Sequence, residues 1–471
     1  MKQRIKLLFA CSCVAAWSAG SLAQSFTWYA STEGNTWKTS TVKMSKRAAD
    51  AHVTVEEHVA PIVEFKAWGA TFNELDWDAL GMLTRDEQDE ILKNVFSPEG
   101  DLRISRGRIS MNANDYARSW YSCDEVAGDL ELRYFNIDRD KQSIIPFIRA
   151  AQKYNPGLTF WTSPWCPPSW MKITGDYPVL SSKFNHMPEK MNYILYGNVN
   201  DKVDPDEMKL VGRRGDKFPR QLATTDYFIQ DPRYLQAYAN YFCKFIDAYK
   251  EQGVNIDMVI YQNEAYSYTP YPGCAWTAEG TVRFNRDYLG PTLRQKHPEV
   301  KLYLGTFNTN RVDYVQKIAS DTKLQEYVSG MAFQWEGRES LPVLRKEHPE
   351  WNYMCSESEC GWGSFDWGAG EHTFELMNHY LGNGCNEYTF WNFILADNGE
   401  SPWGWKQNAL IRVDSKARTF TYTPEYFAVK HYSHFITKGS QVVAYKAQGD
   451  DRMPVSVSYT HLRAHETPEH L

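Results

Sequence analysis

An amide and a carboxylate stand side by side at the end of an apolar run of the sequence. Asn263 and Glu264 close the segment MVIYQNE, residues 258–264. Both groups are costly to bury without partners, so a helix N-cap or a surface loop is the ordinary explanation for such a pair. A second carboxylate that follows another apolar run favours a catalytic explanation instead.

That second carboxylate belongs to the segment YMCSESECGWG, residues 353–363. In a regular strand Cys355, Glu357 and Glu359 share one face, and two acids on one face would repel each other in a dry core. A polar cavity is therefore the expected place for them.

Short apolar segments, several of which end in Asn or Glu, alternate with longer segments. Helices are predicted over 231–252, which ends before Gly253, and over 140–153, where Pro146 makes the first turns uncertain. This alternation predicts an α/β fold, a (β/α)8 TIM barrel, in which the strand ends carry the chemistry. The eight predicted strands are 62–72, 102–112, 158–165, 257–264, 301–307, 327–336, 352–359 and 387–393.

Strands four and seven lie across the mouth of such a barrel, so Glu264 and Glu357 can face each other over a sugar ring. Retaining glycosidases need two carboxyl groups about 5–5.5 Å apart, one as nucleophile and the other as acid and then base. Apolar neighbours would keep the acid protonated, and hydrogen-bond donors would keep the nucleophile ionised. The amide of Asn263 can hold the sugar's 2-OH.

From about Trp68 to Ala444 the sequence resembles glycoside hydrolase family 30 of clan A, whose best-known members are the glucosylceramidases. Six motifs in the family's order carry the resemblance. They are AWGATFNE (67–74), NDYARSWYSCDE (114–125), TSPWCPPSWMK (162–172), YQNEAYSYTPYPGCAWTAEG (261–280), YMCSESECG (353–361), and YTFWNF followed by SPWGWKQNALI (388–411).

The resemblance implies Glu264 as the acid/base, Asn263 as its companion and Glu357 as the nucleophile. The family pattern places the nucleophile after a small hydroxyl residue, and Glu357 and Glu359 both satisfy it. Counting from the start of the strand favours Glu357, with Glu359 as the alternative. The resemblance also implies that the sugar at the non-reducing end is held by Asp115, Trp165 and Trp391.

The leaving-group side departs from the glucosylceramidase pattern. The sequence Gln334-Trp335-Glu336 stands where the pattern of those enzymes resembles His-Trp-Tyr, and 305–308 lacks their acidic pair. We expect Gln334 and Trp335 to contact substrate. The segment SPWGWKQN is more similar to the bacterial and fungal branch of the family, which includes β-1,6-glucanases. A ceramide aglycone is therefore less expected than an oligosaccharide or polysaccharide.

The sequence thus predicts a retaining β-glycoside hydrolase that is β-1,6-glucanase-like or glucosylceramidase-like. The alternatives are a β-xylosidase or β-fucosidase of the same family, or a non-catalytic carbohydrate-binding barrel, which would be expected to have lost one of the two carboxylates. No metal or organic cofactor is expected, because two carboxylates supply both the acid and the nucleophile. The net charge of −7 over 471 residues offers no basic footprint for nucleic acid.

The chain ends predict export and a small second domain. Residues 1–24 have the basic, apolar and small-residue regions of a cleaved signal peptide, which predicts a periplasmic or secreted protein. A lipoprotein signal at Cys11 fits less well, and no apolar run is long enough for a transmembrane segment. Seven cysteines remain after the signal, and an odd number without regular spacing predicts no disulfide framework.

We expect strands in 25–60 and return strands in 425–454 to form a β-sandwich-like side domain beside a barrel over 61–424. The C-terminal part of that domain reads as truncated. The tail 455–471 has no strand pattern and is predicted to be non-native or disordered. The polar connection 172–230 is predicted to shape the substrate site, with a disordered insertion as the alternative.

Overall fold

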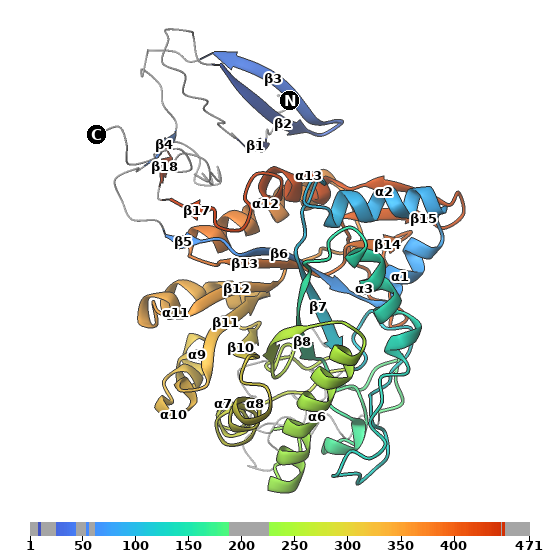
Figure 1. The fold of residues 1–471 in the computed structure, drawn as a ribbon, viewed down its shortest axis with the longest axis vertical. Coiled ribbons are helices and arrows are strands. Elements are labelled where there is room, and N and C mark those ends of the chain that lie inside the picture. Colours follow the sequence, from blue (N-terminus) through green and yellow to red (C-terminus); the bar gives the residue numbers. More distant parts are fainter. Residues whose placement is uncertain are drawn as a thin grey trace.

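Eight parallel strands close into a barrel in the computed structural model, which describes residues 8–10 (backbone), 25–43, 53–55, 62–187, 226–443 and 445–447 (Figure 1). Each of the eight predicted segments overlaps one barrel strand, so the TIM-barrel prediction is confirmed. The strands are β6 (Ala67–Phe72), β7 (Arg106–Met111), β8 (Thr159–Pro164), β9 (Ile256–Ile260), β10 (Lys301–Phe307), β11 (Val328–Gln334), β12 (Asn352–Glu357) and β13 (Glu387–Phe390), and β13 pairs with β6 to close the ring.

Helices cover the outside of the barrel (Figure 1). Alternation along the strands divides the buried side chains into an outer set against the helices and an inner set on the barrel axis. The inner set is Trp161, Met258, Ile260, Tyr303, Ala332 and Met354. The helices are α1 (Glu74–Gly81), α2 (Arg85–Phe96), α3 (Ile144–Gln152), α6 (Pro232–Glu251), α7 (Ala278–Phe284), α8 (Gly290–Lys296), α9 (Val312–Ala319), α10 (Thr322–Gln325), α11 (Leu341–Glu347), α12 (Trp367–Gly382) and α13 (Pro424–Ser433).

The two helices predicted from the sequence form with small changes. In α6 the Asp231 side chain caps the first turn, Pro232 stands at the first helical position, and Gly253 follows with a φ of +74°. The segment predicted as 140–153 is divided into a 3₁₀ turn at Asp140–Gln142 and the helix α3. Pro146 lies in the first turn of α3, where a missing N–H leaves no intrahelical bond unmade.

A three-stranded sheet that the sequence pattern did not predict follows the last barrel strand. It consists of β14 (Ile394–Ala396), β15 (Ile411–Asp414) and β16 (Thr419–Tyr422). Each strand has only three or four residues, which is too short for alternation to stand out in the sequence.

Strands near the two chain ends pair with each other. β17 (Gln441–Val442) pairs with β5 (Val63–Glu64), and β18 (Tyr445–Ala447) pairs with β4 (Val53–Val55), both antiparallel. A separate sheet contains β1 (Leu8–Ala10) and the hairpin of β2 (Ser25–Thr32) and β3 (Asn35–Lys43). Most of the predicted signal 1–24, the tail 455–471 and 188–225 of the long connection lie outside the described residues.

Within the described residues no helix is long and apolar enough to cross a membrane, and no group of three or more His, Cys, Asp or Glu side chains is placed to hold a metal ion. Seven cysteines fall in the same ranges, and each is buried and outside any disulfide.

Candidate active site

Glu264 follows the carboxyl end of β9 in a backbone conformation that few residues adopt. Its φ is +50°, in the left-handed region, and its backbone N–H donates to Thr306 Oγ1 at 3.1 Å. Its carboxylate Oε1 accepts a hydrogen bond from Gln334 Nε2 at 3.2 Å. Contacts from β10 and β11 therefore fix both the backbone and the side chain of Glu264.

Glu357 is the last residue of β12 and is buried. Its Oε2 accepts a hydrogen bond from Arg108 Nη1 at 2.6 Å, and its Oε1 accepts one from Trp335 Nε1 at 3.0 Å. Two donors, one of them charged, therefore hold both carboxylate oxygens of Glu357 in place.

The expectation that Cys355, Glu357 and Glu359 share one strand face is wrong. Cys355 packs in the outer set against the helices, yet Glu357 bonds to Arg108 within the barrel mouth. The register between β11 and β12 shifts here, so that Phe333 pairs with Cys355 but the next residue of β11 pairs with Glu357. Such a bulge turns a side chain toward the other face, and the strand ends before Glu359.

Arg108 connects three strand ends. Besides Glu357, its guanidinium donates to Asn263 Oδ1 at 2.7 Å and to Ser163 Oγ at 3.2 Å. It also lies over the ring of Trp165, 4.3 Å from the centroid. Burial lowers the pKa of Arg108, and the charge of Glu357 opposes that shift.

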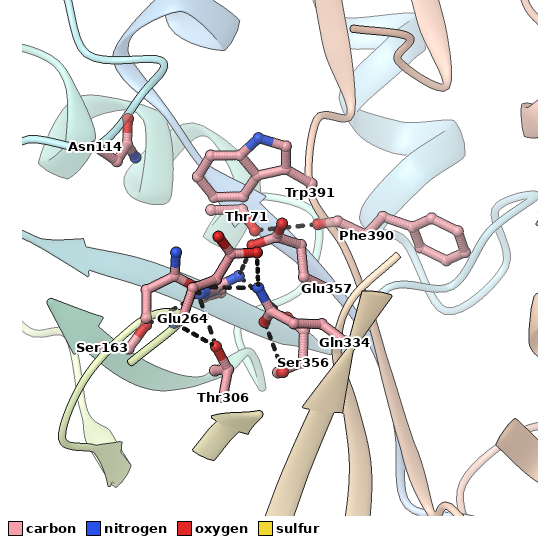
Figure 2. A network of polar contacts seen from close by, with 12 residues as sticks. Thr71, Asn114, Ser163, Glu264, Thr306, Gln334, Ser356, Glu357, Phe390 and Trp391 are labelled. Carbon is pink, nitrogen blue, oxygen red and sulfur yellow. Dashed lines mark hydrogen bonds and ion pairs between the residues drawn. The ribbon is translucent and has the colours of Figure 1, made fainter. Parts of the chain in front are cut away.

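Asn263 and Gln334 complete the network, and Figure 2 shows Gln334 beside Glu264. Asn263 Oδ1 accepts from Arg108 at 2.7 Å, from Thr306 Oγ1 at 3.1 Å and from Gln334 Nε2 at 3.2 Å. Because three donors occupy that oxygen, the Asn263 side chain has its amide nitrogen left to donate to a ligand. Gln334 is oriented by Ser356, whose hydroxyl donates to Gln334 Oε1 at 2.9 Å.

Aromatic rings and one acid lie beside this network. Trp165 and Trp391 stack with ring centroids 4.8 Å apart, and Figure 2 shows Trp391 next to Glu357. Asp115 is buried, and burial together with the charge of Glu357 raises its pKa. In Figure 2 the carboxyl groups of Glu264 and Glu357 point into the same space. The structure therefore gathers two carboxylates, amide donors and aromatic faces at the carboxyl ends of the strands.

Comparison with known proteins identifies the family. The model of the glycosyl hydrolase family 30 TIM-barrel domain matches residues 65–183 and 228–436, which contain all eight barrel strands. This chain belongs to glycoside hydrolase family 30. It is accordingly an O-glycosyl hydrolase by family.

Individual proteins to which this chain is similar share less than a third of their aligned residues with it. Lysosomal acid glucosylceramidase of Mus musculus is 28% identical over 389 residues, which cover 77% of this chain and 66% of that protein. Endo-1,6-beta-D-glucanase of Neurospora crassa is 23% identical over 399 residues, which cover 80% of this chain and 72% of that protein. The crystal structure of SrfJ from Salmonella typhimurium shares the fold, with a TM-score of 0.71, 18% identity and coverage of 88% of this chain and 84% of that one.

Glu359, the alternative nucleophile of this family 30 chain, lies in a different set of contacts. Its two carboxylate oxygens pair with Arg338, on the turn after β11, and with His372 Nε2 of α12 at 2.8 Å. Glu357, in contrast, is bonded to the network that also holds Asn263 and Gln334.

Sequence reasoning missed the residue at the centre of the network, Arg108. A signal was present, because the apolar strand segment 104–111 contains two arginines. Arginine is almost never fully buried unless it is paired, so an arginine inside a buried strand predicts a carboxylate partner. Thr306 and Ser163 carry no comparable signal, since short hydroxyl residues are common in strands.

Proposed function

We propose that this family 30 chain is an exported retaining β-glycosidase that cleaves β-glucosidic linkages by double displacement. Glu357 is the nucleophile and Glu264 is the acid/base. The observation that supports these roles is that both glutamates stand at strand ends of the barrel, joined through Arg108, Asn263 and Gln334. Export rests on the character of residues 1–24.

In the first step a carboxylate oxygen of Glu357 attacks the anomeric carbon, and the glycosidic bond breaks as Glu264 gives its proton to the departing oxygen. In the second step Glu264, now a carboxylate, takes a proton from water. The water oxygen attacks the anomeric carbon and releases Glu357. The anomeric configuration is inverted twice and is therefore retained.

The surrounding residues hold the sugar through this sequence. The amide nitrogen of Asn263 donates to the 2-OH, a contact that strengthens as positive charge develops on the ring. Asp115 lies close enough to Glu357 for the two charges to interact, so it is placed to bond a hydroxyl of the same sugar. The stacked pair Trp165 and Trp391 supplies an apolar wall.

We favour a β-1,6-linked glucan as the substrate. Support comes from the Neurospora crassa endo-1,6-beta-D-glucanase among the relatives and from the polar side chains of Gln334 and Thr306, which border Glu264. A ceramide aglycone would place lipid chains at this polar border.

A substrate panel tests the specificity. Purified protein is assayed on aryl β-glucoside, β-xyloside and β-fucoside, on β-1,6-glucan and on glucosylceramide, and proton NMR of the fresh product gives its anomeric configuration. We expect release from the glucoside and the glucan with retention. Release from xylosides alone, or an inverted product, would refute the proposal.

Two variants test the assignment of roles. Glu264→Gln should lose turnover on ordinary glucosides but keep a burst with 2,4-dinitrophenyl β-glucoside, whose leaving group needs no protonation. Glu357→Gln should give no burst with either substrate. A burst from Glu357→Gln would reverse the assignment.

A further inference from the structure

Trp362 stands in the loop between β12 and α12 and is 70% exposed, unlike the buried Trp165 and Trp391. A single exposed indole is common on protein surfaces and by itself indicates little. The rings around Trp362 are what suggest a function for it. Trp362 is adjacent to other aromatic rings that lead toward the catalytic network.

The rings form a connected set, which we call the outer aromatic set: Trp362, Trp405 and Tyr271. Trp362 and Trp405 have centroids 5.5 Å apart, and Trp405 and Tyr271 have centroids 6.0 Å apart. Trp405 and Tyr271 pack against the cluster that contains Trp165 and Trp391. Aromatic surface therefore extends from the pocket wall to solvent.

The loop that carries Trp362 is held in place on both sides. Gly361 and Gly363 have φ values of +60° and +78°, and a Cβ on Gly363 would lie 2.4 Å from the carbonyl oxygen of Asn398. Asn408 N–H donates to the Cys360 carbonyl at 2.6 Å, and Asn408 Oδ1 accepts from Phe365 N–H at 3.3 Å. The exposed indole is thus presented from a fixed turn.

We propose that the outer aromatic set binds a sugar unit of an extended β-glucan chain, beyond the unit that occupies the catalytic pocket. This inference rests on the proposed glucosidase function. Tyr271 comes from the loop after β9, which also carries Glu264. Trp362 comes from the loop that follows Glu357 at the end of β12, and Trp405 comes from the connection between β14 and β15. A neutral sugar chain fits this surface, because the three contributing side chains carry no formal charge and an aromatic face covers the C–H face of a sugar ring.

The test compares Trp362→Ala with wild type on substrates of different length. We expect kcat/KM for gentio-oligosaccharides of four or more units to fall about tenfold, as loss of a single stacked ring would produce, while that for an aryl β-glucoside changes less than about twofold. Trp362→Phe should restore most of the loss. Tyr134→Ala, which removes an exposed ring outside this set, should behave like wild type.

Binding provides a readout that does not need turnover. In the Glu357→Gln background, calorimetric affinity should increase with oligosaccharide length, and Trp362→Ala should remove that increase. Equal length dependence with and without Trp362 would overturn the inference even if glucoside hydrolysis is intact. Absence of glucoside hydrolysis by wild type would refute the proposed function, and binding would still decide the role of Trp362.

Discussion

Two arginines on β7, Arg106 and Arg108, are both buried in the barrel but have different surroundings. Arg106 lies toward the amino ends of the strands, where it pairs with Asp257 at 2.7 Å and with Glu387 at 2.9 Å. Arg108, toward the carboxyl ends, has one carboxylate partner in Glu357, at 2.6 Å, and the neutral amide of Asn263.

The electrostatic consequence is opposite at the two positions. Burial lowers the pKa of both guanidinium groups, but at Arg106 the charges of Glu387 and Asp257 more than offset burial and raise the pKa. At Arg108 burial prevails over the charge of Glu357, and its pKa is lowered. At the amino ends of the strands, Arg106 therefore belongs to a structural ion cluster in which two carboxylates surround one guanidinium. At the carboxyl ends, the positive charge of Arg108 is directed at the reacting carboxylate of Glu357.

The largest expected effect comes from removing the charge of Arg108. Arg108→Met should lower kcat/KM by about a thousandfold, because Glu357 loses a preorganised charged donor in a dry site. Arg108→Lys should recover little, since one ammonium cannot reach both Glu357 and Asn263. Steady-state kinetics on aryl β-glucoside, with circular dichroism to confirm folding, measure this. If Arg108→Met keeps kcat/KM within tenfold of wild type, Arg108 contributes as little to catalysis as we expect of Arg106.

Removing the charge of Arg106 should affect stability instead. Arg106→Met leaves Asp257 and Glu387 without their shared cation and should lower the free energy of unfolding by about 3 kcal/mol. The folded fraction should keep its kcat within about threefold, since Arg106 touches none of the reacting groups. Urea unfolding and active-site titration separate the two quantities. A large fall in kcat at unchanged stability would contradict the assignment of Arg106 to stability and of Arg108 to catalysis.

The two arginines also show which features of the barrel can be predicted from the sequence. The eight strands were predictable because apolar runs with helical segments between them are local patterns. Glu264 and Glu357 were found because they follow such runs. The ion pairs of Arg106 and Arg108 were not predicted, since their carboxylate partners lie between 151 and 281 residues further along the chain.

The bulge before Glu357 was unpredictable for a related reason. Strand alternation is a property of one segment, but the register shift depends on how β11 pairs with β12. The sheet β14-β15-β16 escaped prediction because its strands are too short for a period to be visible. Sequence patterns located the strand ends, and pairing between distant segments decided where the side chains point.

A smaller effect is expected at Glu359, which pairs with Arg338 and His372 outside the catalytic network. Arg338 lies on the same short turn as Trp335, the indole that donates to Glu357. Glu359→Gln should loosen this turn and lower kcat/KM about tenfold, mainly through kcat. In the Trp335→Phe background the substitution should have little further effect, since a positioning residue acts through its partner.

The alternative outcome at Glu359 is equally definite. If Glu359→Gln abolishes the burst with 2,4-dinitrophenyl β-glucoside while Glu357→Gln retains it, Glu359 is the nucleophile. In that case the carboxylate that pairs with Arg108 would not be the one that reacts.

The smallest expected effect concerns Glu425, a buried carboxyl group that shares a small cavity with Trp391. Burial raises its pKa from 4.5 to about 8, so between these values the unfolded chain has released a proton that the folded chain still binds. Stability should therefore fall as the pH rises, by about 1 kcal/mol from pH 6 to pH 7, and level off above about pH 8. Glu425→Gln should remove this part of the slope in urea unfolding at several pH values. An unchanged slope would mean that Glu425 is ionised in the folded protein, and that a buried carboxyl group here can remain charged without an arginine among its partners.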